Sequence, residues 1–287
     1  MIHGSINNLE ELLGLKQLNG GNSSERTFTA GNVSDSRARV YGGQFLGQGL
    51  IAASLVCPGP IRSFHCYYIR AGSTDVPLTY VARASGAELV SVQATQNDKT
   101  LFSMDVAFGG FVHAPNVAMP AVAPPEQCTT RSDGIRGLNS DTDSTWAVTD
   151  SPFNYRFVEN IWSPEYAAAG HNVWFRASDP AELDPSVAQT LVQAMTAYFA
   201  DDPIMDNALF PHGWHRSWTE LQTASLDHAM WFHAPLDLRQ WMLFAQDSPV
   251  ATGGRAITRG LMFNPVGELV ASVCQEILMR TTVSASR

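Results

Sequence analysis

Two stretches of this chain look like versions of one segment: residues 62–70, RSFHCYYIR, and residues 225–233, SLDHAMWFH. Both are rich in aromatic residues and flanked by apolar ones, and a turn residue follows each, Gly72 in the first and Pro235 in the second. A repeat with a period of roughly half the chain indicates that one structural unit is used twice. We therefore expect two similar units that share a core, with the function in the differences between them.

Composition and charge narrow the class of protein. The 287 residues are 45% apolar and 16% charged, which is typical of a folded globular chain rather than a disordered one. The net charge is −9, and the 18 Lys and Arg form no cluster that would neutralise a run of phosphates. We therefore expect no nucleic-acid partner, although local Arg residues or a helix N-terminus can still bind a nucleotide-bearing substrate.

The cysteines and the chain ends predict a soluble, cytoplasmic protein. Cys57, Cys66, Cys128 and Cys274 show neither C-x-x-C pairing nor a zinc-finger spacing, so we expect reduced core residues and no metal site. Residues 1–8 lack the basic and apolar regions of a signal peptide, and the apolar runs are too short to span a membrane.

In both halves, the hydrophobic pattern predicts helices followed by an antiparallel meander. For the first half it predicts helices over 8–15 and 43–57 and strands over 61–70, 78–84, 89–96 and 100–108, with a turn at 97–99. Because glycines weaken the second of these helices, we expect it to pack closely against a sheet. The segment 112–150 is rich in Pro, Gly, Ser, Thr and Asp, which indicates a linker between domains over 1–111 and 151–287.

The second half repeats this order. We expect a helix from Pro185 to about Asp201, with Asp184 as its N-cap, and strands over 217–232, 241–248, 255–263 and 269–280. A long apolar helix followed each time by a meander predicts the α+β class, with a sheet wrapped around a central helix.

Polar residues distinguish the second copy from the first. Aligning His65 with His228 places Arg62 opposite Ser225, and Gln275 interrupts an apolar row on the last strand. Asp201 closes the second helix, where the negative end of the helix dipole disfavours a carboxylate. A carboxylate, a hydroxyl and an amide together are sufficient to activate water at a carbonyl. A helix-end acid before Pro is also commonly just solvated, so both interpretations stand.

Other residues allow a structural interpretation beside a functional one. His228 and His233 are five apart on a strand and so lie on opposite faces, which disfavours a shared metal. The glycines before Gln44 either offer backbone donors to an anion or simply allow close packing. The chain has no G-x-S-x-G elbow, Walker loop or G-x-G-x-x-G fingerprint, which argues against an α/β-hydrolase, a P-loop enzyme and a dinucleotide oxidoreductase.

Five segments resemble the type II acyl-CoA thioesterases: residues 40–48 (VYGGQFLGQ), 63–65 (SFH), 70–72 (RAG), 225–233 and 271–276 (ASVCQE). The resemblance extends over about residues 9–281 and implies a double hotdog fold. It further implies hydrolysis of fatty acyl-CoA to free acid and CoA, without an acyl-enzyme. Asp201 would then polarise the attacking water, Ser225 would orient it, and Gln275 would donate to the thioester oxygen.

The resemblance also suggests contacts and partners. The residues expected to bind substrate are Gly43, Gln44, His65, Arg70, His228 and Trp231. The substrate is acyl-CoA, no cofactor is needed because CoA belongs to the substrate, and we expect a homo-oligomer. On this interpretation the site lies wholly in the second half, and the choice of Asp201 over Asp202 rests on the spacing to residues 211–213.

The chain departs from the family pattern at two places. Residues 89–96 lack the usual basic pair, and Ala71 replaces the proline of Arg-Pro-Gly, which bears on substrate length and CoA contacts and favours a narrowed acyl pocket.

Two other functions remain as alternatives. One is a hotdog hydratase or dehydratase that uses His228 with Asp227, although neighbours on a strand face opposite ways. The other is an acyl-CoA-binding module without turnover.

Overall fold

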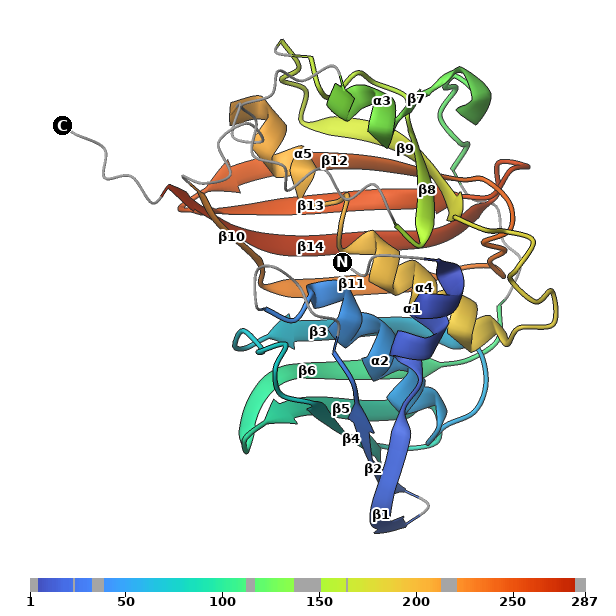
Figure 1. Cartoon of the computed structure of the whole chain (residues 1–287), viewed down its shortest axis with the longest axis vertical. Helices are drawn as coiled ribbons and strands as arrows, with labels where there is room; N and C mark the ends of the chain where they lie inside the picture. Colours follow the sequence, from blue (N-terminus) through green and yellow to red (C-terminus); the bar gives the residue numbers. More distant parts are fainter. Residues whose placement is uncertain are drawn as a thin grey trace.

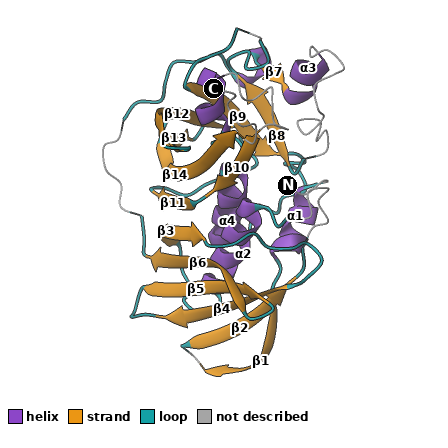
Figure 2. Ribbon diagram, turned by 90° about the vertical axis from the view of Figure 1, so that its left-hand side faces the viewer, coloured by secondary structure: helices purple, strands orange, loops and turns teal. Residues whose placement is uncertain are grey.

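The computed structural model describes residues 5–22, 24–32, 39–111, 117–136, 151–163, 165–212 and 221–281. The strands of these residues form one fourteen-stranded sheet, ordered β1-β2-β4-β5-β6-β3-β11-β14-β13-β12-β9-β8-β7, with β10 paired to β14 (Figure 1). Helices α1, α2 and α4 lie together on one side of the stacked strands (Figure 2).

The elements of the first half are α1 (Ile6–Leu13), β1 (Lys16–Asn22), β2 (Glu25–Ala30), α2 (Gly42–Ser54), β3 (Ile61–Tyr68), β4 (Leu78–Ala84), β5 (Leu89–Gln96) and β6 (Lys99–Phe108). The segment between the halves forms η1 (Pro125–Gln127), β7 (Thr129–Thr130) and α3 (Arg131–Arg136). The elements of the second half are β8 (Phe153–Phe157), β9 (Gly170–Ala177), α4 (Gln189–Ala200), α5 (Asp206–Leu209), η3 (Phe210–His212), β10 (Leu221–Ser225), β11 (Asp227–Phe232), β12 (Met242–Thr252), β13 (Arg255–Phe263) and β14 (Leu269–Thr281).

The two repeated segments lie side by side at the middle of this sheet. Strand β3 pairs antiparallel with β11, so that Cys66 faces His228 and His65 faces Ala229. The repeat therefore predicted the architecture, but its alignment was wrong by one position. His228 is buried on the inner face while His65 is exposed on the outer face, and a shift of one residue moves every side chain of a strand to the other face.

Several predicted bounds are confirmed and others are wrong. The strands over 78–84, 89–96 and 255–263 have the predicted bounds. The second central helix begins at Gln189 and not at Pro185, because Asp184 instead closes a turn by accepting the backbone N–H of Ser186. The predicted strand over 217–232 is interrupted at Leu226, and its residues 217–220 lie outside the described part of the chain.

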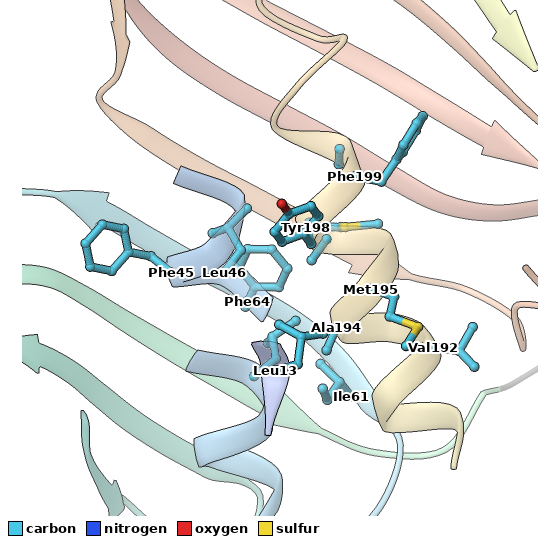
Figure 3. Close-up of a cluster of buried hydrophobic side chains, with 14 of the residues drawn as sticks. Leu13, Phe45, Leu46, Ile61, Phe64, Val192, Ala194, Met195, Tyr198 and Phe199 are labelled. Atoms are coloured by element: carbon cyan, nitrogen blue, oxygen red, sulfur yellow. The ribbon is translucent and has the colours of Figure 1, made fainter. Parts of the chain in front are cut away.

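Helices α2 and α4 run antiparallel in close contact, and apolar side chains from both fill the space beside them (Figure 3). A Cβ atom on Gly43 would lie 2.3 Å from the carbonyl oxygen of Tyr198, and one on Gly47 would lie 3.3 Å from that of Ala194. The glycines of α2 were expected to pack against a sheet. Gly49 does so against β6, but Gly43 and Gly47 instead allow the second helix to approach.

The connection between the halves covers part of the second unit's sheet. Met119 and Val122 pack on a separate apolar cluster that contains Trp174, and the Trp174 Nε1–H donates to the carbonyl of Ala123 at 2.9 Å. Because Val173 and Phe175 belong to the main core, Trp174 lies on the opposite, outer face. The segment predicted as a linker is therefore also a cover for this face.

The four cysteines are free, as expected, but only Cys66 is a core residue; the other three are half-buried. Among the described residues, no helix is long and apolar enough to cross a membrane.

We predict that Gly43→Ala lowers the free energy of unfolding by about 1–3 kcal/mol, because the added methyl group meets a backbone oxygen that cannot move aside. The matched control is Gly49→Ala in the same helix, where the nearest atom is the flexible Met104 Sδ at 3.3 Å. There the higher helix propensity of alanine should leave the protein as stable or up to about 1 kcal/mol more stable. Urea unfolding of both variants checks the difference, and equal effects would contradict it.

Candidate active site

The candidate site lies where the end of α4 meets the start of α2. Asp201 is the C-cap of α4, and its carboxylate accepts the backbone N–H of Gly43 at the first turn of α2. A Cβ atom on Gly42 would lie 2.5 Å from Asp201 Oδ2, so only glycine fits beside the carboxylate. The positive end of the α2 dipole thus offsets the negative end of α4. The sequence analysis placed the site wholly in the second half. The structure shows that Gly42 and Gly43 of the first half also contribute to it.

The side chains of Asp201, Ser225 and Gln275 are mutually hydrogen-bonded. Ser225 Oγ donates to Asp201 Oδ1 at 2.8 Å. Gln275 Nε2 donates to Ser225 Oγ at 2.7 Å and to Asp201 Oδ1 at 3.2 Å. These residues come from the end of α4, the end of β10 and the middle of β14, and the structure brings together the trio that the sequence suggested.

The trio is largely removed from solvent. Gln275 is fully buried, Asp201 is 4% exposed, and Ser225 is half-buried. The buried amide satisfies its polar atoms, because Gln275 Oε1 lies 2.8 Å from Nδ1 of His228 on the neighbouring strand. His228 is also buried, and its ring stacks on Phe64 with a centroid separation of 5.7 Å.

Burial raises the pKa of Asp201 to about 6. The negative charge of Asp202 raises this pKa further, whereas the donors Ser225, Gly43 and Gln275 favour the ionised form and lower it. Asp202 is itself held by two side chains, one from β8 and one from α3 in the segment between the halves. It accepts a hydrogen bond from Tyr155 at 3.1 Å and lies 3.7 Å from the guanidinium of Arg131.

The residues predicted to bind substrate divide into two groups. Gly43 and His228 contact the trio. Gln44 points away, since its amide donates to Asn32 Oδ1 at 2.8 Å, and exposed Arg70 donates to the carbonyl of Thr100.

His65 and Trp231 lie against each other on the outer face, with ring centroids 5.1 Å apart. Each directly follows an inner-face residue of its strand, and neighbours on a strand point to opposite faces. The structure does not bring these two residues, Gln44 or Arg70 to the trio, and their substrate-binding role remains a prediction.

Two tyrosines that sequence reasoning missed support the start of α2. Tyr68 donates to the carbonyl of Gly42 at 3.2 Å, and Tyr41 donates to that of Tyr198 at 2.9 Å. The position of Tyr41 directly before the paired glycines is a sequence feature that could have pointed to its role. No such feature marks Arg131, because it reaches Asp202 from a segment distant in the sequence.

No group of three or more His, Cys, Asp and Glu that could hold a metal ion occurs within the described residues. The hydratase alternative would need the side chains of Asp227 and His228 to act together, but they bond to different partners. Asp227 accepts the backbone N–H of Glu276, and the neighbouring His228 faces the other side of the sheet.

The continuous sheet around a close pair of helices defines the double hotdog class. An acyl-CoA thioesterase II from Mycobacterium marinum has this fold, with a TM-score of 0.73 and 30% identity over 98% of this chain and 99% of its own. A tesB protein from Mycobacterium avium subspecies paratuberculosis, 23% identical, has the same fold with a TM-score of 0.73.

Sequence comparisons identify the family. Residues 155–278 match the acyl-CoA thioesterase model, and residues 29–109 match that of the acyl-CoA thioesterase N-terminal domain. Acyl-CoA thioesterase 2 of Haemophilus influenzae is 29% identical over 96% of this chain and 98% of its own length. Human acyl-coenzyme A thioesterase 8 is 29% identical over 86% and 82%. The chain belongs to the acyl-CoA thioesterase family and is a thioester hydrolase.

We predict that kcat/KM for acyl-CoA hydrolysis falls as the pH drops through about 6, because the water-polarising role expected of Asp201 requires the ionised carboxylate. Asp202→Asn removes a nearby like charge, so it should lower the pKa of Asp201 and move this acid limb to lower pH. Asp202→Glu, which keeps the charge, is the control. Measuring kcat/KM from pH 4 to 8 checks this, and an acid limb that stays in place or rises in the Asn variant would contradict it.

Proposed function

We propose that this enzyme hydrolyses acyl-CoA by direct attack of a water molecule held by Asp201, Ser225 and Gln275. The observation that carries the proposal is the closed set of hydrogen bonds, 2.7 to 3.2 Å long, that joins these three side chains in a largely buried site. The chemistry of each group follows from its partners.

Asp201 is the general base. Its raised pKa of about 6 leaves it ionised at neutral pH and makes it a stronger base than an ordinary aspartate. The N–H of Gly43 and the positive end of α2 keep the carboxylate stable until the water proton is transferred to it.

Ser225 orients the water and is not the nucleophile. Its hydroxyl proton is directed at Asp201 Oδ1, and its oxygen accepts the N–H of Gln275. The His228 imidazole, which lies on the other side of Gln275, bonds to the amide oxygen and not to the serine hydroxyl. Activation of the serine by a neighbouring imidazole therefore has no support here.

Gln275 supplies the hydrogen bond to the thioester oxygen. Both amide protons are occupied, but the bond to Asp201 is the longer one at 3.2 Å and is the easier to redirect when substrate enters. The donor then faces the oxygen on which negative charge grows as water attacks, so its interaction strengthens in the transition state.

The reaction balances with these groups alone. The water oxygen bonds to the carbonyl carbon while its proton moves to Asp201. The tetrahedral intermediate then collapses, the carbon–sulfur bond breaks, and the Asp201 proton passes to sulfur. The products are the free acid and CoA, and the proposed mechanism needs no cofactor or metal.

From the sequence we further propose a cytoplasmic homo-oligomer that acts in fatty-acid metabolism. Exposed Tyr67, near the end of the central strand β3, and exposed Ile69, just after it, support association, because large apolar side chains that are exposed together commonly mark an interface.

We predict that Gln275→Ala lowers kcat about a hundredfold or more, and Asp201→Asn by on the order of a hundred- to ten-thousandfold. Thiol release from short, medium and long acyl-CoAs measures this, with folding checked by melting. The control is Gln246→Ala, which removes another buried glutamine of the same sheet that bonds Asn207 instead. Normal turnover in a folded site variant would refute that residue's role. Acyl-CoA binding without release by wild type would indicate a binding module.

We predict that no acyl-enzyme accumulates. Rapid mixing should show thiol and acid released together without a burst, and the quenched enzyme should keep its unmodified mass. Ser225→Thr retains the hydroxyl and should remain active, whereas Ser225→Ala should lose most activity. An acyl adduct, or a thiol burst equal to the enzyme concentration, would overturn direct water attack.

A further inference from the structure

We propose that His228 is a positioning residue that determines which end of the Gln275 amide faces Asp201 and Ser225. The inference rests on the proposed function, in which Gln275 acts through its nitrogen.

A glutamine amide has nearly the same shape in two orientations, but its ends have opposite roles. Nitrogen donates and oxygen accepts, and rotation of the group by half a turn exchanges them. Only the orientation with Nε2 toward Asp201 places N–H groups where a thioester oxygen enters. The catalytic function of Gln275 therefore requires some interaction that prevents the rotation.

The proton of His228 lies on Nδ1. The ring is 1% exposed, and burial lowers its pKa to about 4, so it is neutral and carries a single N–H. Its Nε2 is buried and has no hydrogen-bond partner in the part of the chain that the structure describes. A proton there would leave a buried donor unpaired, whereas a proton on Nδ1 is donated to Gln275 Oε1 at 2.8 Å.

The hydrogen bonds then run in one direction. His228 donates to Gln275, Gln275 donates to Ser225, and Ser225 donates to the carboxylate of Asp201, which only accepts. Rotation of the amide would set nitrogen against the His228 N–H and oxygen against the carboxylate. Stacking on Phe64, with the rings 12° from parallel, keeps the imidazole in place for this contact.

The protein contains a second histidine of the same kind outside the site. His171 is 1% exposed, its Nδ1 lies 2.9 Å from the oxygen of Asn207, and its ring stacks on Phe157 at 6.0 Å. Burial lowers its pKa to about 4, and its Nε2 has no partner within the described residues. It supplies a matched control for the loss of a buried imidazole.

The kinetic test compares His228→Leu, His228→Asn and His171→Leu by their kcat and KM for acyl-CoA. We expect His228→Leu to lower kcat at least about tenfold with KM changed less than about threefold, because one oxyanion donor is worth about a hundredfold or more. The amide of Asn can reach the position of Nδ1, so His228→Asn should stay within about threefold of wild type. His171→Leu should affect melting but leave the kcat of the folded protein within about twofold.

A double variant separates positioning from a general structural effect. If His228 acts through Gln275, adding His228→Leu to Gln275→Ala should change kcat less than about twofold. Equal losses in both backgrounds, or a folded His228→Leu enzyme with normal kcat, would overturn the proposal.

A third measurement needs neither a variant nor activity. Long-range proton–nitrogen NMR correlation of the wild-type protein distinguishes the two histidine tautomers. We expect the His228 proton on Nδ1, and a proton on Nε2 would overturn the proposal even if His228→Leu fails to fold. Failure of the proposed function looks different: Gln275→Ala would turn over normally while the tautomer stays as expected.

Discussion

The close contact between α2 and α4 is the constraint on which the rest of the structure depends. Gly43 lets α2 approach the carbonyl of Tyr198, and this approach brings the N–H of Gly43 to the carboxylate of Asp201. A larger residue would separate the helices, and Asp201 would then stay at the negative end of α4 without compensation. The helix contact that builds the core thus also makes the charged site tolerable.

The charge of Asp201 is nevertheless costly. Its pKa rises from 3.8 to about 6, which corresponds to about 3 kcal/mol between the protonated and the ionised folded protein. Because the folded pKa exceeds the unfolded one, the contribution of Asp201 to stability is greatest below about pH 4 and is lost as the pH rises from there through about 6. The site is therefore destabilised under the conditions in which the proposed base is ionised, as is common for functional residues.

The sequence predicts the architecture better than it predicts the direction of single side chains. Strands such as β4, β5 and β13 alternate cleanly, so their bounds follow from period two. The repeat alignment paired His65 with His228 by residue identity, yet burial places them on opposite faces. A one-residue error in register is invisible to residue identity and decides which side chains enter the core.

The site shows the same division. The family resemblance suggested Asp201, Ser225 and Gln275, and the structure places them within hydrogen-bonding distance. Arg131 lay beyond prediction because nothing local to it indicates a contact with Asp202, and Gly42 matters through the space beside Asp201, which only coordinates reveal.

The two ends of the α2–α4 helix pair use glutamine differently, which explains why we find a candidate centre at one end and not at the other among the described residues. At the start of α4, Gln193 bonds both the N–H and the carbonyl of Ile61, and Gln189 bonds both backbone groups of Leu236. Glutamines there join α4 to the backbone of its neighbours, and both ends of each amide are occupied by backbone groups. In the trio, Gln275 instead bonds side chains, and one of its donors has only a long contact with Asp201. The same residue type is thus structural at one end of the helix pair and available for chemistry at the other, because Gln189 and Gln193 have both ends of the amide bonded to backbone groups, whereas one donor of Gln275 has only the 3.2 Å contact with Asp201.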